Sequence, residues 1–192
     1  MLVLNNIVLR ECRDADLAFL VRTRQDLDIE IAAQPGPPVS HSIDQFESRL
    51  RAGHLAVSSG APDSIEFILS TVDTENAAPI GVGGLYGLDA HNRVAEFGVT
   101  ISDRSHWGTG AGFDAHLALL QYGFEYRGLH RMYAHVKADN TGVLRLCQRL
   151  GMTQEGILRQ HRWKRGKYVD LVVFGLLAEE WDPTLVDWRE AR

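Results

Sequence analysis

The chain has 192 residues, of which 45% are hydrophobic and 23% charged, and this balance is ordinary for one globular domain with a substantial core. No stretch approaches the roughly 20 apolar residues that cross a bilayer, and the short apolar N-terminus lacks the basic start of a secretory signal, so we expect neither a membrane span nor export. The formal net charge of −5 argues against a nucleic-acid-binding face.

The first part of the chain predicts a strand followed by two helices. Residues 1 to 10 are rich in Leu, Val and Ile and predict the first strand, and capping residues at 13 to 16 precede a helical run that starts at Leu17. The proline-rich segment at 34 to 38 predicts a loop. A second helix is expected from Ser42, after which apolar residues recur at helical spacing.

Three strand-like runs follow, separated by short turn-forming segments. They cover residues 65 to 72, 79 to 86 and 94 to 101, and a turn at 58 to 64 precedes them. Strands at such short spacing predict an antiparallel meander.

The second half of the chain alternates helices and strands. Its elements are, in order, a glycine-rich turn at 107 to 112, a helix that ends near Gly128, a strand at 131 to 136, a helix from Asn140 to Gly151, and a hairpin of strands at 152 to 163 and 168 to 177. With the meander, this order predicts one mixed α/β domain that spans residues 1 to 192.

The turn at 107 to 112 is a candidate phosphate site because it joins a strand directly to a helix. A helix N-terminus presents unpaired N–H groups and a partial positive charge, and both favour a bound phosphate. Glycines at 108, 110 and 112 carry no side chains, so the backbone is able to approach phosphate oxygens closely.

Other glycine-rich motifs fit this turn poorly. A dinucleotide fingerprint needs G-x-G-x-x-G in a parallel crossover, whereas the spacing here is G-x-G-x-G after a meander. A P-loop needs Lys and then Ser or Thr after the last glycine, and Phe113 and Asp114 stand there instead. A glycine turn that only packs its helix tightly stays open as an alternative.

Longer segments of the sequence resemble a known family. Residues 95 to 112, which end in Trp107-Gly-Thr-Gly-Ala-Gly112, resemble the core motif of the GNAT superfamily of N-acetyltransferases and in particular its RimJ/RimL-like branch. Residues 128 to 159 resemble the next strand, helix and strand of that branch, and 166 to 177 its closing strand. The resemblance covers residues 7 to 182 and implies a mixed, mostly antiparallel central sheet flanked by helices.

The resemblance also implies a cofactor, acetyl-CoA, which would act as the acyl donor. The pyrophosphate would then be held by the turn, and the pantetheine arm would lie along the strand and contact Asn140. The residues concerned are Val99, Ile101, Trp107, Gly108, Thr109, Gly110, Ala111, Gly112 and Asn140. The branch often carries Lys at the position of Thr109, so one charged contact to phosphate is expected to be missing.

Two residues are candidate catalytic groups. An alkyl ammonium must lose a proton before it attacks a thioester, and Glu96, which matches the strand glutamate of related sequences, is the candidate general base. A solvent-facing strand residue or an ion partner is the alternative for Glu96. Many GNAT enzymes carry a tyrosine that protonates the leaving sulfur, and Cys147 stands at that place. Cys147 is therefore either a substitute acid or a small buried hydrophobe.

The resemblance implies an amine acceptor: a protein N-terminus, an amino acid, a polyamine or an aminated small molecule. The acidic run Asp26, Asp28 and Glu30 either attracts that amine or is a plain exposed helix end. The histidines are dispersed and the two cysteines lie far apart, so we expect no metal site and a reduced, cytoplasmic protein. An exposed strand edge or the tail with Trp181 and Trp188 is the candidate surface for a homodimer.

Two other functions remain open from the sequence. One is a non-catalytic acyl-CoA-binding module that senses the cofactor or acts as a scaffold, which the missing tyrosine favours slightly. The other is a nicotinamide-dependent oxidoreductase, which the glycine spacing disfavours.

Overall fold

The computed structural model describes residues 2–4, 6–33, 44, 48, 63–71 and 77–186. The proline-rich segment at 34 to 38 and most of the turn expected at 58 to 64 lie outside these residues. Of the helix expected from Ser42, only Asp44 and Ser48 are described, and both are helical and exposed.

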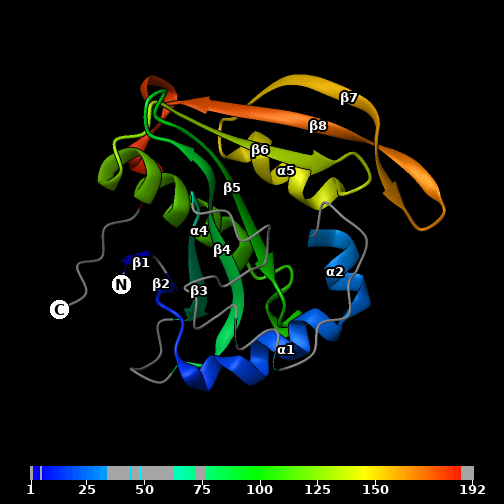
Figure 1. Ribbon diagram of the computed structural model, residues 1–192. Helices are drawn as coiled ribbons and strands as arrows, with labels where there is room; N and C mark the ends of the chain where they lie inside the picture. The colour runs from blue at the N-terminus through cyan, green and yellow to red at the C-terminus, as the bar shows by residue number, and fades with distance from the viewer. Residues whose placement is uncertain are drawn as a thin grey trace.

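An eight-stranded sheet in the order β1-β2-β3-β4-β5-β6-β8-β7 forms the centre of the molecule (Figure 1). Its strands are β1 (Leu2–Leu4), β2 (Ile7–Arg10), β3 (Ile65–Thr71), β4 (Pro79–Asp89), β5 (Val94–Ile101), β6 (Arg131–Lys137), β7 (Thr153–Lys164) and β8 (Lys167–Leu177). Among these described strands, neighbours are antiparallel except for the parallel pair β5 and β6. The prediction of a mixed, mostly antiparallel sheet flanked by helices is confirmed.

The meander and the C-terminal hairpin lie where the sequence predicts them, but the N-terminal prediction of a single strand was wrong. Residues 1 to 10 contain two strands, because β1 folds back on β2 with Leu4 opposite Ile7. Both strands carry apolar residues, so hydropathy alone does not show the tight turn between them.

β5 and β6 pair over only three residues and then part. Val94–Glu96 lie opposite Arg131–Tyr133, whereas β5 continues to Ile101 and β6 to Lys137. Beyond this point β5 stays paired with β4, and β6 stays paired with β8. The backbone edge of β5 that faces β6 therefore has no strand partner after Glu96 among the described strands.

Helices cover both faces of the sheet. On one face, α1 (Leu17–Gln25) packs Leu20 against Ile68 and Val82, and the short helix α2 (Leu27–Ala33) follows it. Figure 1 shows α2 beside the diverging ends of β5 and β6. On the other face lie α4 (Ala111–Gln121), which ends in a π-helical turn (Tyr122–Tyr126), and α5 (Thr141–Arg149).

β5 separates these two environments through its alternating side chains. Ala95 and Phe97 are buried in the core cluster that contains α4, whereas Glu96 between them points to the opposite face and is half-buried. β6 follows the same pattern, with Met132, Ala134 and Val136 buried and the residues between them half-buried. One face of this strand pair is thus apolar and the other polar.

α4 carries a histidine into the core. His116 is 6% exposed, its Nδ1 lies 2.6 Å from the carbonyl oxygen of Gly112, and its ring meets Phe97 edge-on at 5.9 Å. A carbonyl oxygen only accepts hydrogen bonds, so Nδ1 carries the proton and Nε2 presents a lone pair. Burial lowers the pKa of His116 to about 4, and the hydrogen bond to Gly112 raises it by a smaller amount. The imidazole is therefore neutral at pH 7.

This buried imidazole makes stability depend on pH. The pKa in the fold lies below the ordinary value of 6.5, so the unfolded chain takes up the proton first as the pH falls. The contribution of neutral His116 is therefore complete above pH 6.5 and is lost as the pH falls toward 4. Between pH 7 and pH 5, we expect this group alone to lower the free energy of unfolding by about 2 kcal/mol.

Urea unfolding of the wild type and of His116→Leu at both pH values measures this contribution. The variant should lose about 2 kcal/mol less than the wild type on acidification. An equal loss in the two proteins would contradict the burial of a neutral imidazole at this position.

Candidate functional site

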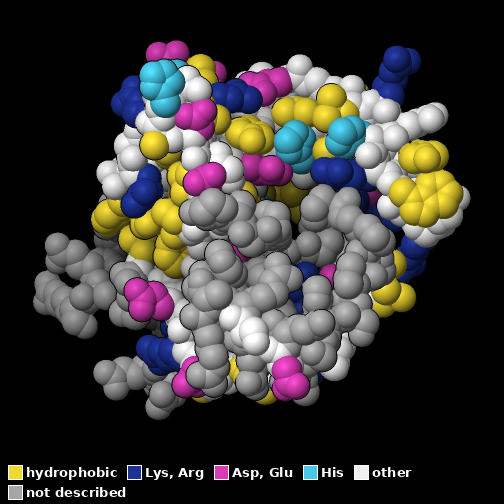
Figure 2. All heavy atoms as spheres, in the orientation of Figure 1, with side chains coloured by type: hydrophobic (Ala, Val, Ile, Leu, Met, Phe, Trp, Pro, Cys, Tyr) yellow, Lys and Arg dark blue, Asp and Glu magenta, His cyan; other side chains and the backbone are white. Residues whose placement is uncertain are grey.

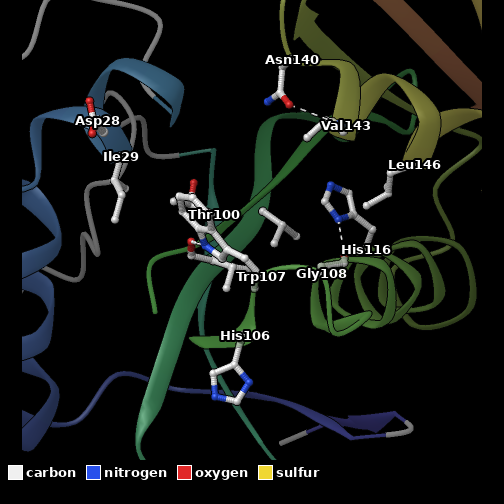
Figure 3. Close-up of a pocket in the computed structure, with 14 residues that line it drawn as sticks. Asp28, Ile29, Thr100, His106, Trp107, Gly108, His116, Asn140, Val143 and Leu146 are labelled. Carbon is white, nitrogen blue, oxygen red and sulfur yellow. Dashed lines mark hydrogen bonds between the residues drawn. The ribbon is translucent and has the colours of Figure 1, made fainter. Parts of the chain in front are cut away.

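A cavity of about 450 Å³ opens where β5 leaves β6 (Figure 3). β5, the turn after it, and the helices α2, α4 and α5 contribute its walls. The lining residues are Asp28, Ile29, Val99, Thr100, Ile101, His106, Trp107, Gly108, Gly112, His116, Asn140, Gly142, Val143 and Leu146. The unpaired edge of β5 thus borders a space of the size that small-molecule ligands occupy.

The turn between β5 and α4 is fixed by its own side chains. Trp107 donates its indole Nε1–H to the carbonyl oxygen of Ile101 at 2.9 Å, and the Arg104 guanidinium stacks over the indole at 5.3 Å. Asp103 accepts hydrogen bonds from the backbone N–H and the hydroxyl of Ser105, and these bonds hold the pKa of its carboxyl below the usual range. The chain therefore arrives at α4 in a defined conformation.

Glycine is required in this turn by backbone conformation. Gly108 has φ +76° and Gly110 has φ +98°, values that side-chain-bearing residues rarely adopt, and α4 begins immediately afterwards at Ala111. The first-turn amides of a helix have no intrahelical acceptor, and the helix dipole adds positive potential there. A Cβ built at Gly108 or Gly110 would meet no atom within 4 Å, so this corner has room for an anionic group.

The predicted cofactor-binding residues all lie in this region, and most of them line the cavity. Val99, Ile101, Trp107, Gly108, Gly112 and Asn140 are lining residues. Thr109, Gly110 and Ala111 belong to the same turn but are outside the lining set; the Thr109 hydroxyl donates to the carbonyl oxygen of His106 at 2.8 Å.

Asn140 closes the opposite wall of the cavity. It is the N-cap of α5, and its Oδ1 accepts a hydrogen bond from the backbone N–H of Val143 at 3.3 Å (Figure 3). The sequence assigns Asn140 to the cofactor; the structure places it in the lining and also gives it a capping role.

Cys147 lies outside the lining set. It is 1% exposed within the core cluster, on the inner side of α5, and burial raises the pKa of its thiol to about 11. This position favours packing over proton donation for Cys147.

Glu96 has a partner that the sequence analysis missed. The imidazole Nδ1 of His135 lies 2.9 Å from Glu96 Oε1, and both side chains are partly exposed on the polar face of β5 and β6. Tyr133, directly opposite Glu96 across the parallel pair, meets the His135 ring edge-on at 5.5 Å. Burial and the Glu96 charge raise the pKa of Tyr133, so its hydroxyl keeps its proton at neutral pH.

A signal for His135 exists in the sequence, but it needs the strand register. In residues 131 to 137 the apolar Met132, Ala134 and Val136 alternate with more polar residues, which predicts that His135 lies on the polar face of its strand. Only the parallel pairing with β5 then brings His135 next to Glu96, 39 positions away in the chain. His116 gives a simpler signal, a lone histidine within an apolar helical run.

The acidic run before the proline-rich segment is neutralised by arginines. Asp26 accepts from Arg104 at 2.9 Å and Glu30 from Arg24 at 2.9 Å, while Asp28 pairs with Arg104 and with Arg165 of the β7–β8 hairpin. Asp26 also caps α2, since its carboxylate accepts from the Asp28 and Ile29 backbone N–H groups. These carboxylates therefore form no unpaired acidic cluster.

Two kinds of feature are absent from the described residues. Nowhere in this part of the chain do three His, Cys, Asp or Glu side chains group as metal ligands. No helix within the same residues is long and apolar enough to span a bilayer.

Curated relatives of this chain are N-acetyltransferases by name. It is 34% identical over 112 residues to the uncharacterized N-acetyltransferase p20 of Bacillus licheniformis, a match of 58% of this chain and 62% of that protein. It is 32% identical over 102 residues to the putative ribosomal N-acetyltransferase YdaF of Bacillus subtilis, a match of 53% of this chain and 55% of that protein. The spermidine N(1)-acetyltransferase of Vibrio cholerae is 30% identical over 92 residues, a match of 48% of this chain and 53% of that protein. The chain thus matches little more than half the length of these relatives.

Among solved structures, the spermidine N-acetyltransferase from Vibrio cholerae in complex with CoA and spermine has the same fold. Its TM-score is 0.78 at 24% sequence identity, with 91% of this chain and 97% of that chain covered. The acetyltransferase (GNAT) domain family itself matches residues 6–153, well over half of the sequence. With a glycine turn at a helix N-terminus and a strand pair that parts beside it, the chain belongs to the acetyltransferase (GNAT) domain family.

Proposed function

We propose that this protein transfers the acetyl group of acetyl-CoA to a primary amine by direct attack in a ternary complex. The observation that carries the proposal is the cavity at the open edge of β5, with a helix N-terminus at its border and a carboxylate–imidazole pair on the opposite face of the same strands. A donor bound on one face would then meet an acceptor that arrives from the other.

The donor fits the residues that border the cavity. Its pyrophosphate would be held by the first-turn amides of α4 and by the turn at 107 to 112, where a side chain is absent at three positions. Its pantetheine arm would run along Val99 and Ile101, whose strand lacks a partner on that side, toward Asn140. An amide-rich chain there would supply the hydrogen bonds that a neighbouring strand normally makes.

The reaction needs one proton removed and one delivered. The pair of Glu96 and His135 would take a proton from the ammonium, and the free amine would attack the thioester carbonyl to form the C–N bond. A backbone N–H of β5 near Val99 would stabilise the oxyanion. The C–S bond would then break, and the second amine proton would pass to the thiolate of CoA.

Cys147 is an alternative donor of the proton that the sulfur receives. Its burial and its raised pKa support a packing role, so we assign departure of the thiolate without a dedicated acid from this chain. A thiolate is a good leaving group, which makes such a departure chemically reasonable.

Further properties belong to the same proposal. We place the chain in the RimJ/RimL-like branch on the W-G-x-G-x-G turn and on its likeness to a putative ribosomal N-acetyltransferase. The spermidine acetyltransferase relatives support polyamines as a class of acceptor to test.

We further infer one domain across residues 1 to 192, a cytoplasmic location from the free cysteines, and a homodimer through the β7 edge. Trp181 packs on Phe124 within the same chain, and Trp188 lies outside the described residues.

The phosphate site is tested at Gly112, which lines the cavity within the first turn of α4. Gly112→Asp should weaken CoA binding at least tenfold, about 1.4 kcal/mol, because it adds a negative charge beside the expected pyrophosphate. Gly112→Ala is the matched control, since its Cβ would meet Leu146 at 3.9 Å and Ile101 at 4.0 Å, which are ordinary contacts. Calorimetry with CoA measures both variants, and equal affinities would refute the site.

The activity is tested by release of CoA thiol from acetyl-CoA with a panel of spermidine, spermine, amino acids and peptides with free N-termini. Thiol release above the amine-free rate is expected for at least one of them. Glu96→Gln should lower that rate at least about tenfold, because it removes the negative charge from the pair that takes the proton, with little effect on CoA affinity. CoA binding without amine-dependent release across the panel would instead favour the sensor or scaffold function.

A further inference from the structure

His135 lies at the point where β5 and β6 separate. The last residue pair of the parallel ladder is Glu96 with Tyr133. Continuing that register by two residues would set His135 across from Gly98, in the open part between the strands. Gly98 has no side chain, and a Cβ built there would meet only Tyr86, at 3.7 Å. The imidazole thus lies beside the stretch of β5 that has no strand partner, although His135 itself is outside the lining set of the cavity.

The protonation of His135 follows from its hydrogen bond. An ionised carboxylate only accepts hydrogen bonds, so Nδ1 donates its proton to Glu96 Oε1 at 2.9 Å. In the neutral ring, Nε2 then carries a lone pair and no proton. No described residue forms a hydrogen bond with Nε2, and the side chain is 28% exposed, so this nitrogen is available to an incoming molecule.

The surroundings of His135 come from three strands. Glu96 faces it from β5, Tyr133 and Lys137 lie on the same face of β6, and its partner on β8 is the uncharged Val173. Lys137 is directed away to α2, where its Nζ donates to the carbonyl oxygen of Ile31 at 2.8 Å. Figure 2 shows histidine and acidic side chains side by side over β5 and β6, at the edge of a hollow in this face.

We propose that Nε2 of His135 is the atom that takes the proton from the acceptor amine, and that Glu96 is a positioning residue behind it. This inference rests on the proposed function. In this step an N–H bond of the ammonium breaks, its proton moves to Nε2, and the nitrogen keeps the electron pair that forms the new C–N bond. The carboxylate holds the ring in the correct tautomer and stabilises the imidazolium, which later releases its proton to solvent.

His135→Asn separates this role from a structural one. The asparagine side chain can keep an N–H donor near the place of Nδ1 and can still satisfy Glu96, but it has no basic nitrogen. We expect kcat/KM for the best amine of the panel to fall at least about a hundredfold at pH 7, as loss of a general base does, with CoA affinity unchanged. Unchanged CoA affinity also reports that the variant is folded; if it does not fold, His135→Gln takes its place.

The pH profile of kcat/KM provides a second readout that a structural role would not move. The deficit of His135→Asn should shrink as the pH rises toward about 10, where an alkyl amine has lost its own proton and needs no base. Glu96→Gln should keep the acid limb of the profile, because the imidazole remains, whereas His135→Asn should remove it.

The outcomes of this experiment are distinct. An active wild type together with near-normal activity of His135→Asn would refute His135 as the base and leave the acetyltransferase proposal intact. A deficit that is equal at every pH would also refute it, since a positional defect has that form. A wild type that releases no CoA thiol with any amine would overturn both proposals.

Discussion

The early separation of β5 from β6 is the constraint on which the site depends. Three residue pairs hold the strands together, and each strand then follows its other neighbour, so the edge of β5 that faces β6 has no strand partner beyond Glu96 among the described strands. At the end of this edge the carbonyl oxygen of Ile101 accepts from the Trp107 indole instead. Backbone N–H and C=O groups are costly to bury without partners. A ligand that carries amides of its own would pair with such groups, as we propose for the pantetheine arm in the cavity along this edge.

The same strand pair keeps two chemical environments apart. Side chains of β5 alternate between the apolar core under α4 and the polar face that carries Glu96 and His135. Neutral His116 lies on the first side, where it lines the cavity, whereas His135 is partly exposed on the second. In the proposed reaction, one strand would therefore border the donor on one face and carry the proton-accepting groups for the acceptor on the other.

Electrostatic contacts from distant segments hold α2 at the open end of the site. Lys137 of β6 donates to the Ile31 carbonyl oxygen, and burial together with nearby cations lowers the pKa of this lysine to about 8. Arg165 of the β7–β8 hairpin and Arg104 of the β5–α4 connection both pair with Asp28. The contacts of Asp28 are exposed and individually weak, but together these contacts join three parts of the chain around one opening.

Local sequence was enough to predict the meander, the strand–turn–helix unit and the glycine turn, because these features depend on local periodicity and on backbone conformations that few residues adopt. It did not determine the N-terminal hairpin, the helix α2, the burial of Cys147 or the arginine partners of Asp26, Asp28 and Glu30. The pairing of Glu96 with His135 was decided by tertiary structure alone. It requires the parallel register of two strands that a whole helix separates in the chain, and local sequence carries no information about that register.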